Sequence, residues 1–232
     1  MSESEKEPLT AALERFNRKE RNLLFRAVLG NNEERLKMDK EFREKVESKL
    51  KITIAPDAWW ATDYHINWLA GALAIYTDEN KYLGMVQPNE PEDDRALIEG
   101  NQEDIDLVIA SGRNLILVEA KAYGSWSNSQ LEHKMVRFKL LYDYNIKLAR
   151  EQDAASPVLI HLLLVSPKGS EKITVEYPDW ARKDPKDSTF PWIELQLPLP
   201  IERILQVNRC ECGAKNKPSA EGKCWCIAKL KK

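Results

Sequence analysis

Three ionisable residues, Asp106, Glu119 and Lys121, stand at the ends of two short apolar runs in this chain of 232 residues. The runs cover residues 105–109 and 115–121, and the Ser-Gly-Arg-Asn sequence between them is typical of a turn. Both runs are rich in β-branched side chains and too short for ordinary helices, so they predict a β-hairpin. A charge in an apolar strand is costly unless it has a partner or a function. Two carboxylates and a lysine brought together across a hairpin can hold a divalent cation and activate water beside it.

This arrangement resembles the core of the PD-(D/E)XK nuclease superfamily, which has an aspartate on its second strand and a Glu-x-Lys motif on its third. The run Glu-Asp-Ile-Asp-Leu-Val and the motif Glu119-Ala120-Lys121 carry the resemblance, which covers residues 60–167. Ile105 replaces the proline that gives the superfamily its name. The resemblance implies a restriction endonuclease-like fold and metal-dependent hydrolysis of phosphodiester bonds.

By this resemblance, Asp106 and Glu119 would bind Mg²⁺ or Mn²⁺, hard ions that prefer carboxylate oxygens, with the main-chain carbonyl of Ala120 as a third ligand. Lys121 would orient or deprotonate the attacking water, or stabilise charge on the phosphate. A structural ion pair at a strand end is the alternative for these residues. Gln130 corresponds to a glutamine that several nuclease families of the superfamily place near the site, and an exposed first-turn residue is the alternative.

The superfamily also has an acidic residue on a first helix, and Asp63 and Glu20 are the two candidates. We expect a buried helix over residues 60–76, in which Asp63 would be either the site acid or an N-terminal cap. Glu20 falls on the apolar stripe of a helix expected over residues 9–29. A buried ion pair with an arginine such as Arg26 is the structural explanation for that position.

The other patterns predict an α/β fold with a mixed sheet flanked by helices. A short first strand is expected within residues 82–86 or 96–99, and a long helix with Ser129 and Glu132 as its capping box follows the hairpin. The continuous apolar run of residues 157–165 predicts a strand buried on both faces. Three segments result: an N-terminal helical extension, a restriction endonuclease-like core and a small zinc ribbon, over residues 1–55, 56–200 and 201–232.

All four cysteines lie in the C-terminal tail, as the pairs Cys210-Glu211-Cys212 and Cys224-Trp225-Cys226. Residues i and i+2 of a strand share a face, so a hairpin would direct four thiolates to one point, which suits tetrahedral Zn²⁺. Disulfides and unliganded thiols are the alternatives. Four basic residues around the pairs can hold a nucleic-acid backbone or a partner protein: Arg209, Lys215, Lys217 and Lys223.

Composition narrows the classes of function. The hydrophobic content of 43% is enough for one sizeable core, and the net charge of −2 argues against a generic polyanion binder. The charge is uneven, because residues 78–106 carry ten acidic and two basic side chains, whereas residues 203–232 carry eight basic and two acidic ones. No apolar run approaches the ~20 residues that span a bilayer, and the N-terminus lacks a signal-peptide pattern, so we expect a cytoplasmic protein.

The sequence therefore predicts a metal-dependent nuclease that acts on nucleic acid, with DNA as the expected substrate. One alternative is a non-catalytic module that keeps the nuclease-like fold and binds nucleic acid or protein. A zinc-ribbon adaptor with the large domain as scaffold is another. Metal binding at the carboxylates separates the first hypothesis from the other two, whereas the fold alone does not. Oligomeric state, substrate specificity and endonuclease or exonuclease action stay open.

Overall fold

The structure is a computed structural model that describes residues 8–89, 96–99, 103–122, 126, 128–152, 156–169, 173–182, 184–200, 203–213 and 218–229. Its elements follow one another in the order α1 (Leu9–Phe16), α2 (Glu20–Val28), α3 (Lys40–Leu50), β1 (Trp59–His65), α4 (Ile66–Tyr82), β2 (Asp104–Ser111), β3 (Asn114–Ala120), α5 (Asn128–Glu151), β4 (Leu159–Ser166), η1 (Asp179–Ala181), β5 (Trp192–Glu194), β6 (Leu205–Cys210) and β7 (Cys224–Lys229).

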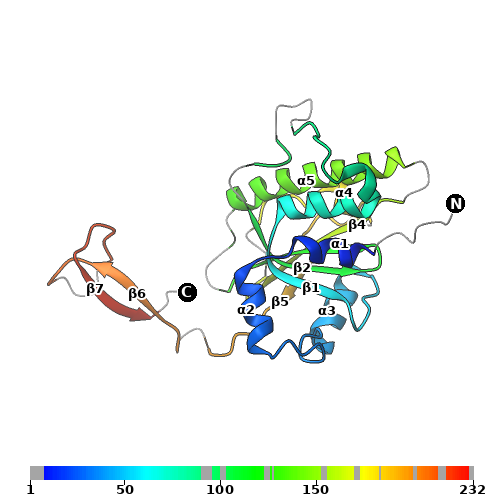
Figure 1. The fold of residues 1–232 in the computed structure, drawn as a ribbon. Coiled ribbons are helices and arrows are strands. Elements are labelled where there is room, and N and C mark those ends of the chain that lie inside the picture. Colours follow the sequence, from blue (N-terminus) through cyan, green and yellow to red (C-terminus); the bar gives the residue numbers. More distant parts are fainter. Residues whose placement is uncertain are drawn as a thin grey trace.

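Five strands form one sheet in the order β1-β2-β3-β4-β5 (Figure 1). The pairs β1–β2 and β2–β3 are antiparallel, whereas β3–β4 and β4–β5 are parallel. Helix α5 is the crossover that parallel β3 and β4 require. The predicted α/β class, with a mixed sheet between helices, is confirmed.

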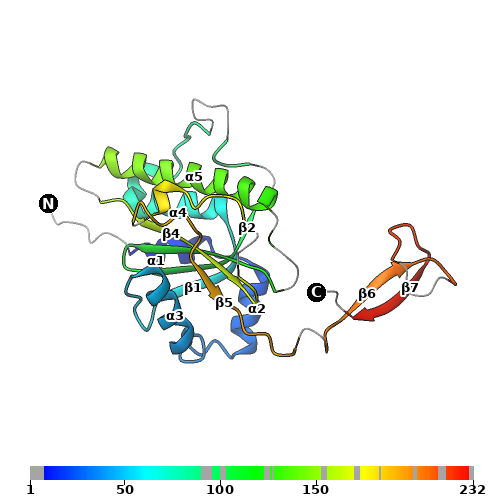
Figure 2. The ribbon, with the colours of Figure 1, turned by 180° about the vertical axis from the view of Figure 1, so that it is seen from behind.

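Helices cover both faces of this sheet. On one face, α1, α4 and α5 bury side chains such as Leu13, Leu69 and Leu141 (Figure 1). On the other face, α3 packs Val46 and Leu50 against β2, β3 and β4 (Figure 2). Each such side chain contributes about 1.5–3 kcal/mol on burial, so the strands are held from both sides. The segment predicted as an N-terminal extension thus supplies α1 to one apolar layer and α3 to the other.

The predicted hairpin, the helix after it and the buried strand are all present. Strands β2 and β3 pair from Leu107↔Val118 to Ser111↔Asn114, with Gly112 in the turn at φ 57°. Strand β4 buries every residue after Leu159, as expected for a strand covered on both faces.

The prediction of a helix beginning at residue 60 is wrong, and so are both predicted positions of the first strand. Residues 59–65 form β1, helix α4 begins at Ile66, and residues 82–86 and 96–99 contain no strand. Bulky aromatic side chains such as Trp59 and Trp60 suit a pleated, half-buried surface. Their apolar pattern is also compatible with a buried helix, and the antiparallel pairing with β2 decides between the two.

The single helix predicted over residues 9–29 is also wrong. Helix α1 ends at Phe16 because Asn17 is extended (φ −74°, ψ 93°), and α2 begins at Glu20. Glu20 is exposed on α2 and does not face the core. Arg26 pairs with Glu33 at 3.0 Å, so it is not the partner that the structural explanation of Glu20 gave as an example.

Strands β6 and β7 form a separate antiparallel hairpin, which lies apart from the five-stranded sheet (Figures 1 and 2). Among the helices in the described part of the chain, none has the length and apolar character needed to cross a membrane.

Candidate active site

A cavity of about 350 Å³ lies where β2 begins, β3 ends and α5 begins. Asp106, Glu119, Lys121 and Gln130, four of the five residues predicted for the site in the core, line it together. The complete lining is Glu103, Asp106, Glu119, Ala120, Lys121, Trp126, Gln130, Leu131, His133 and Lys134.

The strands place Asp106 and Glu119 side by side. The β2–β3 register, continued by one position beyond Leu107↔Val118, sets Asp106 opposite Glu119. The Ala120 N–H donates to Asp106 Oδ2 at 2.7 Å, and the Lys121 N–H donates to the Val165 carbonyl at 2.8 Å. The main chain of the Glu119-Ala120-Lys121 motif is therefore hydrogen-bonded to both neighbouring strands.

Glu119 is the most buried carboxylate of the cavity, with 5% of its surface exposed. Burial raises the pKa of Glu119 to about 7, and the nearby Asp106 and Glu103 add to the rise, whereas Lys134 opposes it. Its Oε1 atom is buried and has no hydrogen-bond partner among the described residues. An orphaned, buried carboxylate oxygen is costly, and it is suited to contact a cation or water.

Lys134 is the closest cation to Glu119. It lies one turn after Gln130 on α5, pairs with Glu119 Oε2, and donates to the Asp104 carbonyl at 3.1 Å. Lys134 is one of several basic residues on this helix, and its type alone does not distinguish it from the others. Its proximity to Glu119 arises from the packing of α5 on the sheet, which periodicity does not show.

Glu103 is a third carboxylate in the cavity, and no local sequence pattern predicts its place there. Its Oε2 atom is buried without a partner in the described part of the chain. The neighbouring Asp104 differs, because Lys19 contacts its carboxylate at 2.7 Å and His65 Nδ1 also pairs with it. The signal for Glu103 was the acidic stretch just before β2, but a single sequence does not show which of those acids lies in the cavity.

Asp63 does not lie on a helix as predicted, nor does it cap one. It lies within β1 at the register position opposite Asp106, with a left-handed backbone (φ 52°) that interrupts the ladder between Thr62 and Tyr64. Its carboxylate pairs with Arg21 of α2 at 3.3 Å, and it is not part of the cavity lining.

The donor set of the cavity suits a hard divalent cation that keeps part of its water shell. Within the described ranges, no three His, Cys, Asp or Glu side chains are arranged to hold a metal by themselves. Mg²⁺ is usually bound through one or two carboxylates plus waters and substrate phosphates. Asp106 and Glu119 would supply the carboxylates, and the unpartnered Glu119 Oε1 fits this role.

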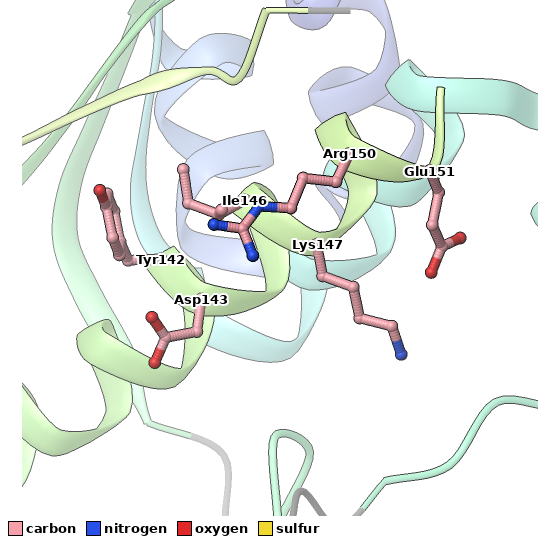
Figure 3. Close-up of a pocket in the computed structure, with 6 residues that line it drawn as sticks. All are labelled: Tyr142, Asp143, Ile146, Lys147, Arg150 and Glu151. Carbon is pink, nitrogen blue, oxygen red and sulfur yellow. The ribbon is translucent and has the colours of Figure 1, made fainter. Parts of the chain in front are cut away.

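A larger cavity of about 580 Å³ lies on the outer side of α5 (Figure 3). All six of its lining residues come from that one helix: Tyr142, Asp143, Ile146, Lys147, Arg150 and Glu151. Its two carboxylates have partners, because Asp143 pairs with Lys139 and Glu151 pairs with Lys81. It is a surface hollow that combines none of the predicted catalytic groups.

The C-terminal hairpin brings the four cysteines together, but two of them form a disulfide. Cys210 is paired in register with Cys224, its thiol is hydrogen-bonded to Cys226, and Cys212 is joined to Cys224. Of the alternatives that the sequence left open, the disulfide is the one present for Cys212 and Cys224, whose Cα atoms lie 5.2 Å apart. Zinc binding stays a prediction for the reduced chain. Lys215 and Lys217 lie outside the described residues.

Comparison with known proteins finds no match to a protein-family model, a curated protein or a solved structure. The function therefore has to be argued from the chemistry of the cavity itself.

Proposed function

We propose that this protein is a metal-dependent nuclease of the PD-(D/E)XK type, with a restriction endonuclease-like core. One observation carries the proposal: Asp106, Glu119 and Lys121, which the sequence analysis selected, line one cavity at adjoining strand ends. The order of an Asp strand, a Glu-x-Lys strand, a helix and a buried parallel strand agrees with the core that the resemblance implies.

Each residue has a defined chemical task in this proposal. Asp106 and Glu119 hold Mg²⁺ or Mn²⁺, with the Ala120 carbonyl as a further ligand. When bound, the metal ion lowers the pKa of a coordinated water and neutralises charge on the phosphate. Lys121, which makes no ion pair with another described residue, stabilises the negative charge that develops on the phosphoryl oxygens. Gln130 lines the cavity from α5, where it can orient the attacked phosphate.

Cleavage assays test this proposal directly. Purified protein is incubated with circular duplex DNA, linear duplex DNA, single-stranded DNA and RNA, in Mg²⁺ and separately in Mn²⁺. We expect metal-dependent cleavage of DNA that is lost in Asp106→Asn and Glu119→Gln, whose shapes match the wild type. All four substrates remaining intact in both metals would contradict the proposal.

A non-catalytic nucleic-acid-binding module is the second candidate, and the Lys134–Glu119 ion pair favours it. A permanent ammonium on Glu119 would neutralise the cavity without metal. In that case the protein binds nucleic acid equally well with and without divalent cation, and Glu119→Gln leaves binding unchanged. A mobility-shift assay in EDTA and in Mn²⁺ distinguishes the two candidates.

A further inference from the structure

The ammonium group of Lys134 lies within the cavity, at a place where a metal cation could also bind. Its ammonium contacts Glu119 Oε2 and the Asp104 main-chain carbonyl, and 22% of its side chain is exposed. A divalent ion bound to Glu119 would lie in the same negative region. Two cations cannot share a carboxylate at close range without strong repulsion.

The negative charge of the cavity exceeds what Lys134 can compensate. Glu119 is buried with an unpartnered Oε1, and Glu103 likewise has an unpartnered Oε2 among the described residues. The carboxylate of Asp106 accepts a hydrogen bond from the main chain at Ala120. Three carboxylates thus line a cavity that contains the ammonium groups of Lys121 and Lys134.

We propose that Lys134 is an exchangeable counter-ion, which neutralises Glu119 while no metal is bound and leaves it when a divalent cation binds. This inference rests on the proposed function. The ammonium then turns toward the opening of the cavity, where the phosphate of the substrate would lie. Lys134 is thus a positioning residue that links metal binding to phosphate binding.

The structure makes this movement feasible. Lysine carries its charge on a flexible stem of four methylenes and has three donors, so it can change acceptors without movement of the helix. The Asp104 carbonyl is a second acceptor that does not depend on Glu119. An arginine at this position would hold the carboxylate in a more rigid, bidentate pair.

Calorimetric titration with Mn²⁺ at pH 8, without nucleic acid, tests the inference. We expect Lys134→Met and Lys134→Gln to bind Mn²⁺ about tenfold more tightly than the wild type, since a competing unit charge has gone. Lys134→Arg keeps the charge and would hold Glu119 more rigidly, so it should bind Mn²⁺ no more tightly than the wild type. Lys139→Met on the same helix lies on its exposed side and should match the wild type. DNA cleavage at saturating Mn²⁺ should nevertheless fall in both neutral variants.

If Lys134 had a purely structural role, its neutral variants would bind Mn²⁺ no more tightly than the wild type. Folded Lys134→Met or Lys134→Gln with unchanged or weaker Mn²⁺ affinity would overturn the inference. The proposed function would survive that result if the wild type binds Mn²⁺ and cleaves DNA, and Glu119→Gln does neither. If neither the wild type nor the Lys134 variants bind Mn²⁺, the inference and the proposed function both fail. The glutamine variant guards against misfolding, because its amide can still donate to Glu119 and to the Asp104 carbonyl.

Discussion

The carboxylate cavity and the C-terminal hairpin each gather several ionisable side chains, yet they are supported in different ways. The strands that carry the carboxylates of the cavity have apolar side chains that are almost completely buried, such as Leu117 and Val118 at 1% exposure each. The hairpin has no such support, because Val207 and Trp225 on one of its faces are 67% and 69% exposed. Its other face carries the sulfur atoms of Cys210, Cys224 and Cys226, of which Cys224 is in the disulfide with Cys212.

This difference indicates what holds each group of residues in place. In the core, packing on both sides of the sheet fixes the carboxylates whether or not a ligand is bound. An isolated two-stranded hairpin is at best marginally stable in water, and small units need disulfides or metals. The geometry of the hairpin therefore depends on the chemical state of its own sulfur atoms.

The largest effect is expected when a packed side chain of the core is shortened and the loss of stability is compared with that for a side chain of the hairpin. Leu117→Ala should lower the free energy of unfolding by about 2–5 kcal/mol, because the cavity that it leaves lies within a sheet covered on both faces. Val207→Ala should change it by less than about 0.5 kcal/mol, since the side chain is exposed. Urea denaturation measures both values, and similar losses in the two variants would contradict the comparison.

Lys121→Ala should lower DNA cleavage by about 100-fold or more, because in the proposed function its ammonium acts on the transition state and not on the core. The melting temperature should change little, since Lys121 is partly exposed at the strand end. Lys139→Ala is the matched control and should cleave like the wild type, since its ion pair with Asp143 lies on the exposed side of α5. Equal cleavage by wild type and Lys121→Ala would exclude a catalytic role for this lysine.

Glu119→Gln should stabilise the protein at pH 8 but not at pH 4.5. The folded chain keeps a proton on Glu119 up to about pH 7, whereas the unfolded chain releases it near pH 4.5. Stability is therefore lost as the pH rises through this window, and the amide variant avoids that loss, which is on the order of 1–2 kcal/mol. Unfolding free energies at both pH values, with Glu132→Gln on the exposed surface of α5 as control, provide the measurement. A wild type that gains stability relative to Glu119→Gln between pH 4.5 and pH 8 would contradict the assignment.

The smallest effect on the whole protein should come from the hairpin. After reduction, Cys210, Cys212, Cys224 and Cys226 should bind one zinc ion per chain, and Cys226→Ser should abolish this binding. The melting temperature of the core should stay unchanged in that variant. Elemental analysis of protein purified under reducing conditions without chelator checks the stoichiometry, and its failure to detect zinc would leave the disulfide as the structural link of the hairpin.

Sequence patterns predicted the parts of this molecule that local chemistry determines. The β2–β3 hairpin followed from two short apolar runs and a Gly-containing turn, and the shared cavity of Asp106, Glu119 and Lys121 followed from the alternation of strand side chains. Strand β1 was missed, since its aromatic run fits a buried helix equally well until its pairing with β2 is known.

Local sequence patterns could not predict that two residues, Glu103 and Lys134, line the cavity. Glu103 precedes β2 in a stretch rich in acidic residues, so its type and position do not distinguish it from its neighbours. Lys134 reaches Glu119 only because α5 packs across the sheet, which is a tertiary contact over fifteen positions of sequence. Such contacts follow from the fold and not from the spacing of residues along the chain.

The turn at Gly112 has a consequence for the opposite end of its hairpin. Gly112 adopts φ 57°, a backbone conformation that residues with a Cβ rarely adopt, and the turn fixes the pairing of Ser111 with Asn114. Because strand side chains alternate, a slip of one position there would turn Asp106 and Glu119 toward opposite sides of the sheet. The length of this loop therefore determines whether Asp106 and Glu119 face each other across the hairpin. Insertion of one residue beside Gly112 should separate them without altering any residue of the cavity.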